Sequence, residues 1–170
     1  MDIIKSLFKL TLLALFLFIV SKFFIFKKEE VLFEQPINFN HSIHISQGMG
    51  CEDCHQYVKK EEFAGIPNIE TCESCHSDSL SESSEEKKLI DSIKGRNPIK
   101  WVKVNNLPDH TYFSHRIHVV TGKINCSECH GNMEERKNAV NKPYREFSMK
   151  WCISCHVKKT ADVDCIVCHR

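Results

Sequence analysis

The longest apolar stretch of the chain lies near its N-terminal end. Residues 7–26 read LFKLTLLALFLFIVSKFFIF, in which two lysines and two hydroxyl side chains are the only polar positions. As a helix this stretch is about 30 Å long, which matches the hydrocarbon core of a bilayer. The pattern predicts a transmembrane anchor over 7–26, with residues 1–6 as a cytoplasmic tip.

The alternative for this stretch is a secretory signal peptide that is removed. A signal peptide has a short apolar core that ends at small residues, whereas this run continues through Phe23 to Phe26 without an Ala-x-Ala site. Lys9 and Lys22 lie close enough to its ends to extend to the membrane interface. An uncleaved anchor is therefore the favoured interpretation.

The rest of the chain is poor in large apolar side chains, because six of its eleven phenylalanines lie in the first 26 residues. What remains cannot build a good core by itself. The 23 basic and 22 acidic side chains give a net charge of +1, which excludes a strongly basic nucleic-acid-binding protein and an acidic disordered tail. Ten cysteines and ten histidines are far above ordinary usage, so something other than aliphatic packing must stabilise this part.

The ten cysteines form five C-x-x-C pairs, and a histidine follows each pair directly. The motifs are Cys51-Cys54-His55, Cys72-Cys75-His76, Cys126-Cys129-His130, Cys152-Cys155-His156 and Cys165-Cys168-His169. C-x-x-C-H is the signature of c-type haem attachment, in which two thiols bind the haem vinyl groups and the histidine is the proximal iron ligand. A zinc ribbon does not require the adjacent histidine, and a disulfide scaffold requires neither feature. The sequence therefore predicts five covalently attached c-type haems.

Five haems would share about 135 residues, or about 27 residues each. The macrocycles must then supply most of the apolar core, and a chain without haem is expected to be largely unfolded. We expect a multihaem cytochrome c fold: the transmembrane helix, then a haem-packed domain of short helices at the motifs and irregular loops, with little or no sheet.

Five histidines lie outside the motifs, which equals the number of irons that need a second ligand. They are His41, His44, His110, His115 and His118. The simplest interpretation is that every haem is six-coordinate with two histidine ligands. The alternative is that one or two haems have an open site or a thioether ligand from Met49, Met133 or Met149.

Four of these histidines belong to an internal repeat. The pattern F-x-H-x-I-H begins at Phe39 and at Phe113, and C-x-x-C-H follows each time. We name residues 39–55 the first copy and residues 113–130 the second copy. The offset is 74 residues at the histidines and 75 at the cysteines, so the second copy carries one extra residue. Histidines at i and i+3 share a helix face, so if each binds a different iron, the two haems are near neighbours.

The repeat suggests a division of the chain into modules. We expect a linker over 27–36, a two-haem module over 37–79, a second linker over 80–100 and a three-haem module over 101–170. The polar, acidic stretch 77–87 predicts a solvated linker or loop, and docking to a basic partner is the less favoured use.

The pattern F-x-H-x-x-H followed by C-x-x-C-H resembles the class III multihaem cytochromes c. In that family the first histidine of the pair ligates the haem of the next motif, which implies His41 for the Cys51 haem and His115 for the Cys126 haem. The string PIKWVKVNNLPDHTYFSH over 98–115 and WCISCH over 151–156 resemble the pentahaem subunit of alternative complex III, a bacterial membrane complex that oxidises quinol.

Six-coordinate iron has no vacant position for a substrate, so we expect an electron-transfer protein that is not itself an enzyme. We expect a single-pass protein of the bacterial cytoplasmic membrane with its haem domain on the periplasmic face. Its partners would be integral-membrane quinol-oxidising subunits and a periplasmic electron acceptor, with the C-terminal haem as an exposed port. The alternatives are a multihaem reductase with one open haem and a stand-alone quinol dehydrogenase anchored by one helix.

Overall fold

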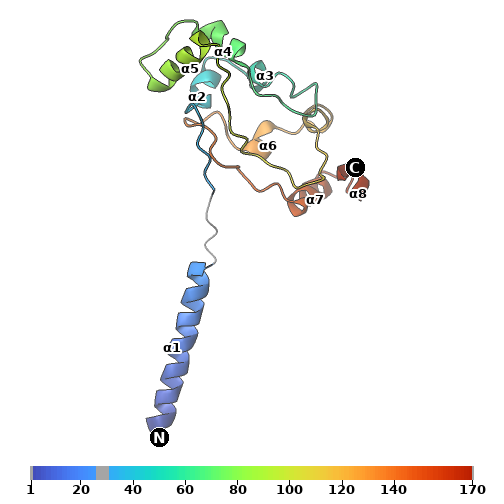
Figure 1. The fold of residues 1–170 in the computed structure, drawn as a ribbon. Coiled ribbons are helices and arrows are strands. Elements are labelled where there is room, and N and C mark those ends of the chain that lie inside the picture. Colours follow the sequence, from blue (N-terminus) through green and yellow to red (C-terminus); the bar gives the residue numbers. More distant parts are fainter. Residues whose placement is uncertain (1, 26–30, 170) are drawn as a thin grey trace. The chain divides into compact units, whose positions relative to one another are not determined.

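The computed structural model describes residues 2–25 and 31–169 and divides the chain into two compact units, Met1–Val31 and Leu32–Arg170. The first unit holds one long helix, α1 (Asp2–Ile25). The second unit holds only short helices joined by loops (Figure 1).

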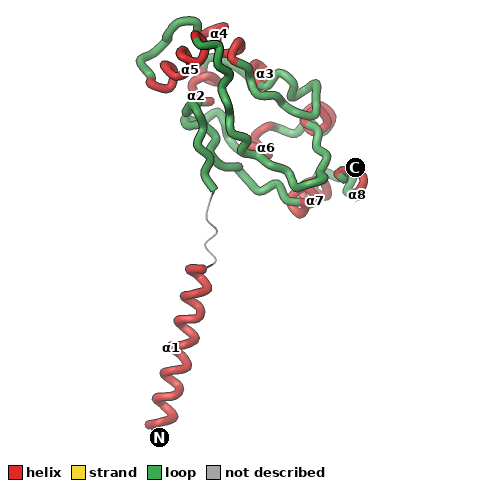
Figure 2. The backbone as a smooth tube through the Cα atoms, in the orientation of Figure 1, coloured by secondary structure: helices red, strands yellow, loops and turns green. Residues whose placement is uncertain are grey.

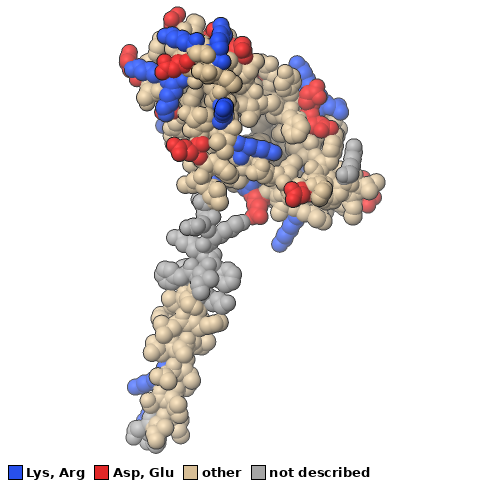
Figure 3. Space-filling view, in the orientation of Figure 1, with Lys and Arg blue, Asp and Glu red and all other residues tan. Residues whose placement is uncertain are grey.

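The α1 helix is long and apolar enough to cross a membrane, by length and composition, over Ile3–Ser21. Its 24 residues correspond to about 36 Å. Apart from lysines toward the N-terminal end, its described surface carries no charged side chain (Figure 3). The helix begins five residues before the predicted anchor, because no glycine or proline precedes Leu7 to stop it. Residue 26 of the anchor, and residues 27–30 of the first linker, lie outside the described residues.

The second unit is built from seven α-helices and one π-helix among its described residues. They are α2 (His41–Ser46), α3 (Cys51–Cys54), α4 (Ile69–His76), α5 (Ser84–Lys94), η1 (Ile117–Thr121), α6 (Cys126–His130), α7 (Met149–Lys158) and α8 (Cys165–Cys168). The part of the chain that the structure describes contains no strand, and loops make up most of this unit (Figure 2). The predicted fold of short helices at the motifs and irregular loops is confirmed.

The apolar core of this unit is thin. Its buried apolar side chains are Ile37, Val58, Ile69, Ile90, Ile93, Val104 and Ala139. Within residues 31–169, no large side chain is completely buried. Protein interiors are normally close-packed, so this unit matches the expectation that bound macrocycles provide much of the apolar contact.

A helix occupies most of the predicted 80–100 linker. Ser83 caps α5 by accepting the N–H of Glu85 at 3.2 Å. The buried side chains of Ile90 and Ile93, three positions apart, lie on one face of α5, which packs against α4. The stretch expected to be a linker therefore contains an amphipathic helix over 84–94, in which Glu86 shares the buried face and the exposed charged side chains are Lys87, Lys88, Asp91 and Lys94.

The two copies of the repeat contact each other reciprocally. The backbone N–H of Arg116 in the second copy donates to the Glu61 carbonyl at 3.2 Å, and that of Ser42 in the first copy donates to the Arg136 carbonyl at 3.0 Å. Each acceptor lies in the loop that follows the other copy's C-x-x-C-H motif. Such an exchange is expected for two copies related by an approximate twofold axis. The copies therefore form one unit and are not separate domains.

Candidate haem-attachment and iron-ligand sites

Each C-x-x-C pair lies on a short helix, and the five helices are α3, α4, α6, α7 and α8. One helical turn separates the two cysteines of a pair, so both thiols lie on one side of the helix. Side-chain caps start two of these helices: Asn68 accepts the N–H of Thr71 at 3.1 Å, and Ser148 accepts that of Trp151 at 3.3 Å. None of the ten cysteines, all of which lie among the described residues, forms a disulfide, so no pair is prevented from attaching a haem.

Three histidines outside the motifs face a motif histidine at nearly the same separation. The ring centroids are 6.1 Å apart for His44 and His76, 6.3 Å for His115 and His130, and 6.0 Å for His118 and His156. The rings of the second pair are almost parallel, at 10°. None of these pairs is close in sequence, so the fold alone brings them together.

The remaining two histidines outside the motifs also lie beside a motif histidine. Burial lowers the pKa of His41 to about 4, and the nearby His55 adds to this shift. His169 donates its Nδ1–H to the backbone carbonyl of His110 at 3.1 Å. Every motif histidine thus has one of the five other histidines as a neighbour.

Backbone carbonyls hold several of these imidazoles in one tautomer. The Nδ1–H of His55 donates to Gly65 O at 2.7 Å, and that of His156 donates to Asp162 O at 2.6 Å. A carbonyl can only accept, so the proton lies on Nδ1 and the Nε2 lone pair is free. This is the arrangement by which proteins orient histidines that ligate a metal.

The electrostatic environment keeps other imidazoles neutral. Burial is the main cause that lowers the pKa of His118 and of His130, and the neighbouring His115 lowers both further. With a pKa of about 4, His41 is neutral at pH 7. The neutral imidazole is the form that binds metals, so these side chains are ready to ligate without losing a proton.

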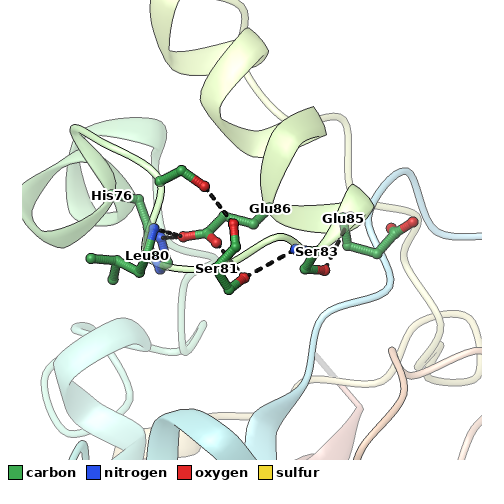
Figure 4. A network of polar contacts seen from close by, with 7 residues as sticks. His76, Leu80, Ser81, Ser83, Glu85 and Glu86 are labelled. Atoms are coloured by element: carbon green, nitrogen blue, oxygen red, sulfur yellow. Dashed lines mark hydrogen bonds and ion pairs between the residues drawn. The ribbon is translucent and has the colours of Figure 1, made fainter.

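One motif histidine has a carboxylate as its partner. His76 Nδ1 lies 2.8 Å from Glu86 Oε1, and the same oxygen accepts the Leu80 N–H at 2.9 Å. Ser81 Oγ donates to Glu86 Oε2 at 2.5 Å (Figure 4). These hydrogen bonds lower the pKa of Glu86 to about 2, with the Ser81 hydroxyl as the largest cause. The carboxylate is therefore ionised at neutral pH.

An arginine with an unsatisfied donor lies close to these sites. Arg145 Nε is buried and has no hydrogen-bond partner, while its guanidinium lies 5.1 Å from the ring centroid of Trp151 on α7. A buried, unpaired N–H of a guanidinium is costly unless an anion meets it. The propionate groups of a haem are anions of the right kind, so this residue fits a bound haem.

The structure brings together the residues that the sequence singled out, and it adds one that sequence reasoning missed. The five histidines outside the motifs are spread along the chain, yet each lies next to a different motif histidine. Glu86 was missed because it stands in an acidic stretch that was interpreted as solvated. The available signal was its position three residues after Ser83, since serine followed three residues later by glutamate marks a helix start.

Comparison with protein families identifies the class of this protein. The model of the class III cytochrome c family matches residues 25–100, and the model of cytochrome c7 and related cytochromes c matches residues 111–170. Together they cover all five motifs. The chain therefore belongs to the multihaem c-type cytochromes, which carry covalently bound haem and transfer electrons. The predicted resemblance to class III cytochromes is confirmed.

Within this class, the chain has a curated relative with a known assembly. It is 32% identical over 162 residues to the menaquinone reductase multihaem cytochrome c subunit of Nitratidesulfovibrio vulgaris, covering 81% of this chain and 77% of the relative. The relative's name makes it the cytochrome subunit of a menaquinone reductase.

Proposed function

We propose that this protein is a membrane-anchored pentahaem cytochrome that conducts electrons along a series of five bis-histidine haems, as a subunit of a quinone-linked respiratory complex. The main observation in support is the distance between the ring centroids of the paired histidines. A bond between a metal and an imidazole nitrogen is about 2 Å, which puts the centroids of two rings on opposite sides of one metal ion about 6.3 Å apart. The three measured separations are 6.0–6.3 Å.

Under this proposal each motif supplies the two cysteines and the proximal histidine of one haem. The distal ligands are His41 for the α3 motif, His44 for α4, His115 for α6, His118 for α7 and His110 for α8. Bound haems would supply one-electron Fe(III)/Fe(II) chemistry, in which no bond is made or broken. Two histidines on each iron leave no position for a substrate, so the chain is expected to conduct electrons without catalysing a reaction itself.

Contacts between cysteines support one spatial order of the five sites. Burial and then the neighbouring Cys126 thiol raise the pKa of Cys51, so α3 and α6 adjoin where the two copies meet. The other adjacent thiols, each of which also adds to the effect of burial, are Cys54 with Cys72, Cys129 with Cys155, and Cys152 with Cys168. The resulting order is α4, α3, α6, α7, α8, as the arrangement in Figure 1 also suggests.

This order differs from the order in sequence only in that α3 and α4 exchange places, so that the motifs of the two copies, on α3 and α6, adjoin. The sites at the two ends belong to α4 and α8. Ile166 on α8 is 74% exposed, whereas Ile69 on α4 is buried. The α8 site is therefore the more accessible end, which supports its predicted role as a port for an external redox partner.

The place of this chain in a complex is proposed from its relative. The relative's name states that its complex reduces menaquinone, so electrons there move toward the quinone. We take the same direction here, from a periplasmic donor through the haem series to quinone-reducing membrane subunits. The same series could also carry electrons away from a quinol, as we expected from the resemblance to alternative complex III. The apolar α1 helix would anchor the chain, with the haem unit on the periplasmic side.

Haem stoichiometry and spin state test the proposal directly. The full chain purified from membranes should carry five covalently bound haems, all low-spin by electron paramagnetic resonance, with a Soret band that carbon monoxide does not move. Fewer than five haems per chain, or a carbon monoxide adduct, would contradict it. Purification in a mild detergent should retain multispanning membrane subunits, and recovery of the chain alone would contradict the assignment to a complex.

A further inference from the structure

The histidine of the α4 motif differs from the other motif histidines in its hydrogen-bond acceptor. His76 faces the carboxylate of Glu86 at 2.8 Å (Figure 4). Three of the other motif histidines instead donate to neutral backbone carbonyls: His55 to Gly65, His156 to Asp162 and His169 to His110. A carboxylate is a stronger acceptor than a carbonyl because it carries a negative charge.

The surroundings of Glu86 hold this carboxylate in place. The Glu86 side chain is only 8% exposed and lies in the first turn of α5, which packs against α4. Its other donors are the Leu80 N–H, at 2.9 Å, and the Ser81 hydroxyl, at 2.5 Å. Both donors are neutral, so they orient the carboxylate without cancelling its charge.

We infer that Glu86 lowers the reduction potential of the haem attached at Cys72 and Cys75, by drawing the Nδ1 proton of its ligand His76 toward the carboxylate. The inference rests on the proposed function, in which His76 ligates that iron. A histidine whose Nδ1–H meets an anion is a more basic ligand, and a more basic ligand stabilises the ferric over the ferrous ion. Glu86 thus tunes the α4 end of the series without touching an iron.

This role is tested by potentiometric titration of the full haem-carrying chain, in which the haem midpoint potentials of the Glu86→Gln variant are compared with those of the unmodified protein. Glutamine keeps the size of the side chain and can still accept the Nδ1–H through its amide oxygen, but it has no charge. One haem should become easier to reduce, with its reduced-to-oxidised ratio at a fixed potential rising about tenfold, which is about 59 mV for a one-electron couple. The other four should titrate as in the unmodified protein.

A matched control separates this local effect from the loss of one negative charge. Glu82 precedes the same helix, its side chain is 98% exposed, and it pairs with Lys87 at 3.0 Å. Glu82→Gln makes the same change in net charge and should leave all five midpoints unchanged. Equal shifts in the two variants would overturn the inference.

A second variant makes the test independent of whether Glu86→Gln assembles. Ser81→Ala removes the hydroxyl that donates to Glu86 Oε2, which concentrates the negative charge of the carboxylate on the hydrogen bond to His76. The same haem should therefore become harder to reduce, opposite to the effect of Glu86→Gln. A structural defect alone would not predict shifts of opposite sign, and an unchanged or higher potential in Ser81→Ala would overturn the inference.

Spectroscopy identifies the haem that responds and separates the two levels of the argument. Proton nuclear magnetic resonance should assign the responding haem through its contacts with side chains of α4, and a response at any other haem would overturn the inference. If the protein carries five low-spin haems and their midpoint potentials are the same in Glu86→Gln, only the inference is overturned. A haem count below five in the unmodified protein would instead overturn the proposed function.

Discussion

The first and second copies of the repeat place their aromatic and imidazole rings almost identically. Phe39 stacks on His44 with centroids 4.4 Å apart and planes at 25°, and Phe113 stacks on His118 at 4.4 Å and 29°. In each copy the second histidine also donates a hydrogen bond from its Nδ1–H to the backbone carbonyl four residues before it, at 2.8 Å. The local geometry of the histidine pair is thus the same in the two copies, although they lie 74 residues apart in the sequence.

The backbone that follows the histidines is where the copies differ. The His44 carbonyl accepts the N–H of Met49, five residues on, whereas the His118 carbonyl accepts that of Ile124, six residues on. The second copy forms a π-helix, η1, where the first copy forms α2. The extra residue of the second copy is absorbed by this wider turn. An insertion can therefore be tolerated between the distal histidines and the attachment motif without disturbing the histidines.

Removal of all the haems is expected to have the largest effect on stability. Both copies of the repeat should then unfold together. Among residues 31–169, seven apolar side chains are buried, too few to offset the conformational entropy of this unit. Full-length chain made without haem attachment should show no cooperative thermal transition by circular dichroism. A cooperative transition in the chain without haem would show that at least one copy folds without haem, which would contradict the prediction.

Loss of one distal histidine should have the next largest effect, and it should be equal in the two copies. His44→Ala and His118→Ala would each leave one iron with an open position. One haem of five should then bind carbon monoxide in either variant, measured as a partial Soret shift. If only one of the two variants bound carbon monoxide, the copies would not share a ligation scheme.

Removal of the stacked phenylalanine should distinguish the copies. Phe39 contacts Trp101 edge-on at 6.3 Å in addition to stacking on His44. An aromatic pair contributes about 1 kcal/mol beyond buried area, so Phe39→Leu should destabilise the protein by about 1 kcal/mol more than Phe113→Leu. Guanidinium unfolding of the two variants measures this difference, and equal losses would show that the Trp101 contact contributes nothing.

The smallest effects concern the two turns. Gly48 in the first copy has φ +87° and Lys123 in the second has φ +52°, a region that costs a residue with a side chain about 1 kcal/mol. Gly48→Ala should destabilise by about that amount, although a new Cβ there meets no atom within 4 Å. Lys123→Gly should remove a similar strain from the second copy. Changes in the free energy of unfolding that have the same sign in both variants, relative to the unmodified protein, would contradict this account.

Much of the candidate site could be predicted from the sequence because its chemistry is local. The two cysteines and the proximal histidine of a haem lie within five consecutive residues, such as Cys126 to His130, and one helical turn is enough to place them. The apolar run of α1 and the repeat from Phe39 and Phe113 are likewise patterns of neighbouring residues. The short helices at the motifs follow from the same local geometry.

The family resemblance already implied the motifs that His41 and His115 serve. Tertiary structure alone decided which motif histidines His44, His110 and His118 lie beside, and in what order the motifs adjoin. His110 lies beside His169 only because distant loops meet there, and α3 adjoins α6 only because the two copies exchange backbone hydrogen bonds. Glu86 could not be recognised as a partner of His76 before α5 was seen to pack on α4. Such contacts join residues that no local pattern relates, since they depend on how the whole chain folds back on itself.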